Sequence, residues 1–375
     1  MKKIILLCCL VLVIVIVYSC KKNVSTSSLG TVSLSLPATP DIYYDSTFLS
    51  AQFSDSLNKE ATLGRVLFYD GHLSVNNSIS CGSCHKQSIG FSDNVALSTG
   101  VEGQLTKRNT LAINTLTFNS GALSSGIANL FWDGREDNVF NLSLRPLTNH
   151  VEMGITDPGT LPAKLAALPY YNQLFLNAYG DNTITVDRIS KAIGLFINSI
   201  QSFNTRFDFY NRGIQNSMTA QEIYGLNLFN TKYNCATCHN TGTVFPGGGG
   251  GYGSISGSFK DIGLDPNYTD LGRGAITGND TDNGTFLIPD LHNVAITGPY
   301  MHDGRYKTLG DVIDHYSHGI ANSPNLDPLL KDANGNARNM NISDDEKAAI
   351  IAFLNTLTDY KMLTDNKFSN PFNIN

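Results

Sequence analysis

Apolar residues recur at helical spacing in four parts of the chain, and strand-like alternation is scarce and short. Spacings of three and four residues place such side chains on one face of a helix, where they form a stripe that faces a core. The pattern therefore predicts a mainly α fold. The four stripes are Leu63, Val66 and Leu67; Ile189, Ile193, Phe196, Ile200 and Phe203; Ile223, Leu226 and Phe229; and Ile350, Phe353, Leu354 and Leu357.

The helix starts and one loop can also be read from the sequence. Thr219 with Glu222, and Ser343 with Glu346, have the spacing of a capping box and predict where the last two of these helices begin. The segment 245–258, "FPGGGGGYGSISGS", is too rich in glycine to hold a helix or a strand. It predicts a mobile loop.

The elements are arranged as an internal repeat. A helix with Gly-x-x-Leu-Phe, at Gly64 and again at Gly225, precedes a Cys-x-x-Cys-His motif each time. An Asn-containing turn and an Asp-Gly-Arg motif follow, in "FWDGRE" and in "YMHDGR", and each half ends on an amphipathic helix. This order predicts two homologous domains over 55–205 and 206–365, followed by a tail over 366–375.

The N-terminus has the features of an export signal. Lys2 and Lys3 precede an apolar run from Ile4 to Val17, which is shorter than the roughly 18 residues of a membrane span. "VYSC" resembles a bacterial lipobox, which predicts a signal peptide over 1–20 and a lipid on Cys20; simple signal-peptidase cleavage is the alternative. Residues 21–54 are rich in Ser, Thr and Pro and predict a flexible tether.

Composition narrows the function. The 375 residues carry a net charge of −6 with no basic stripe, so nucleic acid is not an expected partner. Of seven cysteines, Cys8 and Cys9 lie in the signal and Cys20 at its end. The other four all belong to the two Cys-x-x-Cys-His motifs, which leaves none for structural disulfides.

The motif Cys-x-x-Cys-His suits covalent attachment of haem. Two cysteines at this spacing can form thioethers with both vinyl groups, and the adjoining histidine then reaches the iron. A four-cysteine zinc site and a redox dithiol are the alternatives, but zinc pairs normally lie closer in sequence and neither explains the histidines. The expected attachment residues and proximal ligands are Cys81, Cys84 and His85 for one haem and Cys235, Cys238 and His239 for the other.

From about Leu57 to Tyr360 the chain resembles the bacterial dihaem cytochrome c peroxidases, including the branch of the methylamine-dehydrogenase maturation enzyme. The resemblance implies two tandem class-I-like cytochrome c domains with one haem each, the first haem binding peroxide and the second transferring electrons. It also implies that dimers are common. The motifs that carry it are "LGRVLFYDGHLSVNNSISCGSCH", "FWDGRE", "VEMG", "NCATCH", "TDLGRGAITG", "TGPYMHDGR" and "TLGDVIDHY".

The resemblance assigns roles to individual residues. It implies that Glu152 is the distal acid and base over the first haem, that Pro146 lines the same pocket, and that Trp132 relays electrons between the haems. A proton must move between the two oxygens when peroxide is cleaved, and a carboxylate can carry it. Without the resemblance, Glu152 would be a solvated loop residue and Trp132 a core aromatic.

The resemblance further implies a calcium ion between the domains and arginines on the haem propionates. Asn109, Thr297 and Pro299 match the family's calcium positions and would offer a side-chain oxygen and backbone carbonyls. By themselves they are ordinary turn residues. Arg108 and Arg135 are the propionate candidates, and surface ion pairs are the alternative.

Three positions depart from the common pattern of the family. Val101 stands where reductively activated members have a histidine, so the first haem is expected to be open when oxidised. Tyr316 stands at the usual methionine ligand of the second haem, as in the maturation enzyme, with His315, His318 and Met301 as rival ligands. The third departure, His292 in place of an arginine, puts a propionate contact in doubt.

The resulting prediction is an exported, lipid-anchored, periplasmic peroxidase that reduces hydrogen peroxide with electrons from a small cytochrome c or another periplasmic carrier. Oxidation of a partner protein by peroxide is a second interpretation, favoured by Val101 and Tyr316. A dihaem cytochrome that only transfers electrons is the third. It predicts two six-coordinate irons and no fast reaction with peroxide.

Overall fold

The computed structural model describes residues 55–114, 129–240 and 258–372, together with the backbone of 26–29, 32–35 and 253–254. The predicted signal peptide, most of the predicted tether and most of the predicted glycine-rich loop lie outside these residues. The described chain is mainly helical, as predicted, and its short strands pair in two-stranded antiparallel sheets. Those pairs are β1 (Thr26–Leu29) with β2 (Val32–Ser35), β3 (His239–Asn240) with β4 (Gly253–Ser254), and β5 (Phe259–Lys260) with β6 (Phe286–Leu287).

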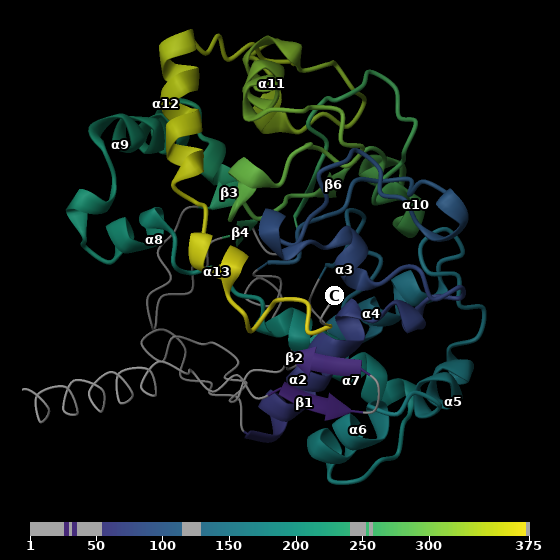
Figure 1. Cartoon of the computed structure of the whole chain (residues 1–375). Helices are drawn as coiled ribbons and strands as arrows, with labels where there is room; N and C mark the ends of the chain where they lie inside the picture. Colours follow the sequence, from purple (N-terminus) through teal and green to yellow (C-terminus); the bar gives the residue numbers. More distant parts are fainter. Residues whose placement is uncertain are drawn as a thin grey trace, which may run out of the picture.

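The first half of the chain forms one group of helices, at the bottom of Figure 1. Its apolar cluster is built largely from the stripes of α2 and α7. The predicted stripe of α7 is confirmed up to Phe196, but the helix ends at Ser199, and the extended backbone of Ile200 leads the chain toward the second half. The elements are α2 (Asp55–Tyr69), η1 (Gly71–Leu73), α3 (Cys81–Cys84), η2 (Gln87–Ile89), η3 (Val101–Gly103), α4 (Val139–Thr148), η4 (Pro158–Thr160), α5 (Leu161–Ala166), α6 (Tyr171–Tyr179) and α7 (Val186–Ser199).

The second half forms another group, at the top of Figure 1, with its own apolar cluster. The capping boxes predicted at Thr219 and Ser343 are confirmed at the starts of α9 and α12. The elements are α8 (Arg206–Asn211), η5 (Gln215–Ser217), α9 (Ala220–Asn227), η6 (Leu228–Lys232), η7 (Cys235–Thr237), α10 (Gly274–Thr277), η8 (Asp280–Asp282), η9 (Val294–Ile296), α11 (Leu309–Asp314), η10 (His315–Gly319), η11 (Pro328–Leu330), α12 (Asp344–Asn355) and α13 (Tyr360–Thr364).

The same helix crossing occurs in both halves, between α2 and α7 and between α9 and α12. A Cβ on Gly64 would lie 1.8 Å from the carbonyl oxygen of Ala192. The corresponding Cβ on Gly225 would lie 1.9 Å from the carbonyl oxygen of Ala349. Only glycine permits so close an approach of two backbones, which explains the repeated Gly-x-x-Leu-Phe motif in physical terms.

The end of the chain returns to the first half. After α13 the backbone runs from the upper group to the lower one (Figure 1), where Phe372 packs on Tyr170. Phe368, which falls in the predicted tail, is 5% exposed and belongs to the first apolar cluster. Within the described residues, no helix has the length and apolar character needed to cross a membrane.

The helix crossing leads to a stability prediction. Gly64→Ala should lower the free energy of unfolding by about 1–3 kcal/mol or more, since the new methyl group overlaps the Ala192 carbonyl and the helices must separate. Gly310→Ala is the matched control, because its Cβ would meet only Thr308 Oγ1, at 3.4 Å. Denaturant unfolding of the holoprotein measures both. Equal stability of Gly64→Ala and the wild type would contradict the crossing.

Candidate functional site

The first Cys-x-x-Cys-His motif forms a short helical turn, α3, directly followed by His85. The imidazole Nδ1 of His85 donates to the carbonyl oxygen of Phe91 at 2.9 Å. Burial lowers the pKa of His85, which keeps the ring neutral. A neutral ring that donates from Nδ1 has its free lone pair on Nε2, the atom available to bind a metal.

The second motif repeats this arrangement with different local structure. Cys235 lies in η7, and His239 follows at the start of β3. Nδ1 of His239 donates to the carbonyl oxygen of Pro289 at 3.2 Å, and burial lowers the pKa of His239. Both histidines are therefore neutral and oriented by a backbone carbonyl, as a proximal ligand requires.

The cysteines do not have the arrangement of a zinc site. All four are free, and burial raises the pKa of both Cys81 and Cys235 to about 12. A zinc site needs thiolates, which this environment disfavours, whereas a thioether sulfur carries no charge. Across the described residues, no three His, Cys, Asp or Glu side chains gather where they could hold a metal ion. These observations favour the haem interpretation over the zinc alternative.

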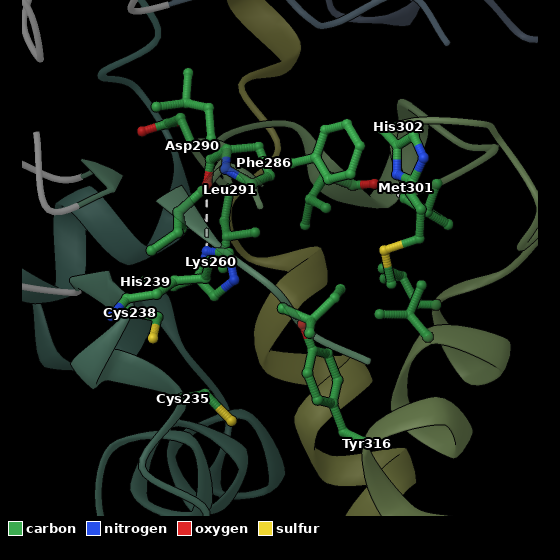
Figure 2. Close-up of a pocket in the computed structure, with 18 of the residues that line it drawn as sticks. Cys235, Cys238, His239, Lys260, Phe286, Asp290, Leu291, Met301, His302 and Tyr316 are labelled. Carbon is green, nitrogen blue, oxygen red and sulfur yellow. Dashed lines mark hydrogen bonds between the residues drawn. The ribbon is translucent and has the colours of Figure 1, made fainter. Parts of the chain in front are cut away.

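The second motif opens into a cavity of about 340 Å³. Figure 2 shows Cys235, Cys238 and His239 on one side of this cavity, with Tyr316 and Met301 on the other. The remaining wall is largely aliphatic and aromatic, with a few polar groups. A deep apolar cavity with two thiols and a neutral imidazole on one side fits a haem.

The four candidate distal ligands of the second site differ in whether they line this cavity. Tyr316 and Met301 line it. His315 is buried, and both of its ring nitrogens are engaged, Nε2 by the carbonyl oxygen of Ile262 at 2.9 Å and Nδ1 by the Tyr306 hydroxyl at 3.2 Å. His318 is exposed and is not part of the cavity wall.

Tyr316 lies in η10, a π-helical turn that extends α11. Burial raises the pKa of Tyr316 well above its ordinary value, and the thiols of Cys235 and Cys238 raise it further. Figure 2 shows Tyr316 on the opposite side of the cavity from Cys235 and Cys238. Single π-turns are frequent at functional sites because they redirect one side chain of a helix.

Trp132 lines the same cavity, although it belongs to the first half. Its Nε1 donates to the carbonyl oxygen of Asn109 at 2.9 Å, and its own carbonyl accepts from the amide of Leu287, in the second half, at 2.8 Å. Trp132 is therefore held at the junction of the halves, with its ring beside the second motif.

The wall of this cavity also includes the three calcium candidates, Asn109, Thr297 and Pro299. The side-chain nitrogen Nδ2 of Asn109 donates to the carbonyl oxygens of Val95 and Ala96, both at 3.1 Å. That orientation turns the amide oxygen away from these two carbonyls. An amide oxygen and backbone carbonyls are donors that suit calcium.

Glu152 lies on the turn after α4 and close to the first motif. Asn149 Nδ2 donates to Glu152 Oε1 at 2.6 Å. Burial raises the pKa of Glu152, an effect that Arg135 and Asn149 partly offset. Burial raises the pKa of Cys81 and of Cys84, and the negative charge of Glu152 raises both further. The carboxyl is thus partly desolvated and within electrostatic range of both thiols.

Val101 and Pro146 occupy the surroundings of Glu152. Val101 is 2% exposed, and its amide donates to the carbonyl oxygen of Glu152 at 3.0 Å. Pro146 is half-buried in the last turn of α4, just before the Glu152 turn. Val101 is therefore a buried aliphatic residue whose backbone is hydrogen-bonded to that of the candidate acid and base.

Arg108 and Arg135, the propionate candidates, are paired with carboxylates of the chain. Arg108 contacts Asp133 at 2.6 Å and Asp270, in the second half, at 2.7 Å. Arg135 contacts Asp133 at 3.0 Å, and its guanidinium lies 3.7 Å from the centre of the Phe131 ring. Any propionate near these arginines would share them with aspartates.

His292, the third departure, is buried and keeps a positive charge. Its Nδ1 contacts Asp290 Oδ1 at 2.7 Å. Burial alone would lower the pKa of His292, but Asp290, Asp208 and Asp359 together raise it to about 9. The position of His292 therefore carries a buried cation paired with Asp290.

Sequence reasoning missed several polar residues of this region. Lys260 and Asp327 form an ion pair of 2.6 Å on the cavity wall, and Asp327 is near enough to Cys238 to raise its pKa beyond the effect of burial. His302 stacks on Phe286 with 3.7 Å between ring centres. No spacing in the sequence marks Lys260 or Asp327, whereas His302 follows the same pattern as Trp132 in the "MHDGR" and "FWDGR" turns.

Comparisons with known proteins agree with this geometry. A family described as "Di-haem cytochrome c peroxidase" matches residues 58–216. Cytochrome c551 peroxidase of Nitrosomonas europaea is 31% identical over 298 residues, covering 80% of this chain and 79% of the relative. The chain belongs to the di-haem cytochrome c peroxidase family. Membership implies haem cofactors.

Other members of the family extend the comparison. Methylamine utilization protein MauG of Methylorubrum extorquens is 30% identical over 302 residues, covering 80% of this chain and 78% of that protein. A solved structure described as a MauG-like protein associated with microbial copper homeostasis has a TM-score of 0.71 at 30% identity and covers 84% of this chain and 93% of its own. The diheme peroxidase BthA of Burkholderia thailandensis shares the fold, with a TM-score of 0.68 at 20% identity, covering 90% of this chain and 97% of that one.

The buried histidinium leads to a prediction of pH dependence. The pKa of His292 rises from its ordinary 6.5 to about 9 on folding, so its stabilising contribution is complete below 6.5 and is lost as the pH rises through 9. The free energy of unfolding should therefore fall over this window, and the fall should be smaller in His292→Gln. His150→Gln, at an exposed histidine, is the control. Parallel pH curves for the wild type and His292→Gln would show that His292 does not titrate in this way.

Proposed function

We propose that this chain is a dihaem c-type peroxidase that reduces hydrogen peroxide to water with two electrons and two protons. The observation that supports it is the difference between two otherwise similar motifs. Each has a neutral histidine held by a backbone carbonyl, but the first adjoins a half-buried carboxyl and an aliphatic side chain, and the second faces a phenol across a cavity. One site is built for chemistry and the other for electron transfer.

Haem would be attached through Cys81 and Cys84 at the first site and through Cys235 and Cys238 at the second, with His85 and His239 as proximal ligands. Haem bound in this way supplies an iron that exchanges electrons and, where a face is open, binds a small ligand. We interpret the two halves as tandem class-I-like cytochrome c domains. The repeated crossing at Gly64 and Gly225 supports this interpretation.

Glu152 is proposed to move the proton during peroxide cleavage. Its carboxylate would accept a proton from one peroxide oxygen and donate it to the oxygen that departs. The hydrogen bond from Asn149 fixes the carboxyl, and burial raises its pKa toward the range where it can both accept and release a proton. Val101 offers no ligand and Pro146 adds an apolar wall, so neither competes with peroxide.

The second site is proposed to pass electrons to the first, with Trp132 between them. Its ring lines the second cavity while its backbone belongs to the first half. Tyr316 is the proposed distal ligand. It lines the cavity, as Met301 does, whereas the Nε2 of His315 is engaged by the carbonyl oxygen of Ile262. A phenolate ligand would favour the oxidised state of this site.

The remaining assignments complete the proposal. Calcium would bind Asn109, Thr297 and Pro299 where the halves meet. Arg108 and Arg135 would form ion pairs with haem propionates as well as with the aspartates that they already contact. The protein would be exported and anchored by lipid on Cys20, which lies outside the described residues. Its electron donor would be a small cytochrome c or another periplasmic carrier.

Oxidation of a partner protein by peroxide is a second candidate function. Two observations favour it: Val101, whose amide donates to the Glu152 carbonyl, is a buried aliphatic residue that offers no iron ligand, and Tyr316 lines the cavity opposite the second motif. The same residues would serve both functions up to the cleavage of peroxide. The difference lies only in what supplies the two electrons, a small carrier or the partner protein.

The first test of the proposal is removal of the Glu152 carboxylate. Glu152→Gln should lower kcat/KM for peroxide by about a hundredfold to ten-thousandfold, because an amide cannot accept the proton. In the wild type, kcat/KM should rise as the pH passes through the raised pKa of Glu152, and this rise should vanish in the variant. Glu102→Gln is the matched control, an exposed residue of the neighbouring loop. Unchanged turnover in Glu152→Gln would remove Glu152 from the mechanism.

The second test concerns activation. The fully oxidised holoprotein should react rapidly with one equivalent of hydrogen peroxide without prior reduction, since Val101 cannot cap the first site. Optical and low-temperature EPR spectra taken before and after the addition measure this reaction. A reaction that begins only after one electron is added would mean that another group caps the site. No reaction in either state would favour a cytochrome that only transfers electrons.

A further inference from the structure

The C-terminal segment 359–372, hereafter the strap, connects the proximal sides of the two motifs. It leaves the second half at Asp359, which is fully buried, and runs to the first apolar cluster. Figure 1 shows this path from α12 through α13 to the C-terminus. Met362 and Phe368, 3% and 5% exposed, are the buried anchors of the strap in that cluster.

The first contacts of the strap are to the residues around His85. Gln87, two residues after His85, donates from Nε2 to the carbonyl oxygens of Met362 at 2.9 Å and Asp365 at 2.8 Å. The ring of Phe368 packs edge-on against Phe91, with 6.3 Å between ring centres. Phe91 supplies the carbonyl that orients His85. The strap therefore contacts both chain segments that set the position of this imidazole.

Further contacts reach the cysteine side of the same motif. The hydroxyl of Tyr69 donates to the carbonyl oxygen of Phe368 at 2.6 Å. The Tyr69 ring lies against the backbone between Cys81 and Cys84, where a Cβ on Gly82 would come within 2.4 Å of it. Arg65, one turn earlier on α2, donates to the carbonyl oxygen of Ser369 at 2.6 Å. Through Tyr69 and Arg65 the strap therefore contacts α2, the helix that packs against the motif.

At its other end, the strap begins on the proximal side of the second motif. The backbone amide of Asp359 donates to the side-chain oxygen Oδ1 of Asn293 at 2.8 Å. The backbone amide of Asn293 in turn donates to the carbonyl oxygen of Leu357 at 2.8 Å. Asn293 follows Pro289, the acceptor of His239, by four residues. The start of the strap is fixed by the loop that orients the second histidine.

The two proximal loops also meet directly beneath the strap. Asn114 Nδ2 lies 3.4 Å from the carbonyl oxygen of Gly90 and 3.3 Å from that of His292, and it donates to both. A Cβ on Gly90 would lie 3.1 Å from Cβ of Asn293. Gly90 is adjacent to Phe91, so the contact lies one residue from the acceptor of His85.

We propose that the strap is a positioning element that fixes the orientation of His85 and couples it to the proximal loop of the second site. A terminal segment normally frays unless specific contacts hold it. Here the polar contacts of the strap, with Gln87, Tyr69 and Arg65, lie at the first motif and on α2, while Phe372 also packs on Tyr170 of the core. This coupling lies on the proximal faces and is separate from the junction at Trp132.

The inference rests on the proposed attachment of haem and concerns residues other than those proposed for peroxide cleavage. Phe368→Ala removes the packing on Phe91, and Gln87→Ala removes the two hydrogen bonds to the strap. Phe175→Ala is the matched control, a fully buried phenylalanine of the same cluster that packs on Tyr171 and Tyr179. All three are measured as full-length holoproteins for melting temperature, ferric EPR spectrum and the midpoint potential of each haem.

Phe368→Ala and Gln87→Ala should both shift the EPR signal and the midpoint potential of the first haem, because the imidazole loses its fixed orientation. Phe175→Ala should lower the melting temperature at least as much as Gln87→Ala does and leave the first-haem signal unchanged. Identical first-haem signals in Phe368→Ala, Gln87→Ala and the wild type would overturn the inference. Absence of two haems from the wild type, shown by its mass and pyridine haemochrome spectrum, would instead contradict the proposed haem attachment.

Discussion

The hydrogen bond from histidine Nδ1 to a backbone carbonyl is the interaction on which the two sites depend. It fixes the tautomer and the tilt of the ring together, leaving Nε2 free to bind. Each carbonyl lies on a loop that follows its histidine in the sequence. Phe91 is six residues after His85, and Pro289 is fifty residues after His239. The rest of the fold, from the crossed helices to the strap, keeps these loops in place.

The two helix crossings show how a repeated sequence yields a repeated scaffold. In each half a glycine, an alanine carbonyl and a phenylalanine meet at one point, so a short motif fixes the distance between two helices. Because that contact is made by backbone atoms, it tolerates different side chains elsewhere. The halves can therefore share a frame while the residues around their motifs differ, Glu152 and Val101 near the first and Tyr316 near the second.

Local patterns predicted much of this structure. The capping boxes at Thr219 and Ser343 and the mainly α fold are confirmed, since they depend on residues a few positions apart. The helical stripes are confirmed except at their C-terminal ends, where Phe229 lies in the π-helical turn η6 and Leu357 lies beyond α12. Family membership is confirmed as well. The end of α7 at Ser199 was missed because the apolar stripe continues past it to Phe203, in a segment that leads to the second half.

Long-range contacts could not be predicted in the same way. Nothing in the composition of 359–372 marks it as a strap that packs on the first half, because its partners Arg65, Tyr69 and Gln87 lie about three hundred residues earlier. Lys260 and Asp327 likewise meet only in the folded chain. The roles of the individual site residues, calcium binding and the lipid anchor stay predictions.

The strap and Trp132 place two kinds of connection between the same pair of sites. Trp132 is an aromatic ring at the cavity wall, tied by its indole nitrogen to Asn109, and suits the transfer of electrons. The strap is a chain segment that contacts the proximal loops of both histidines through packing and hydrogen bonds. It is suited to transmit a movement of one loop to the other. In the proposed function both connections matter, because electrons passed to the first site would be useful only while His85 keeps its orientation.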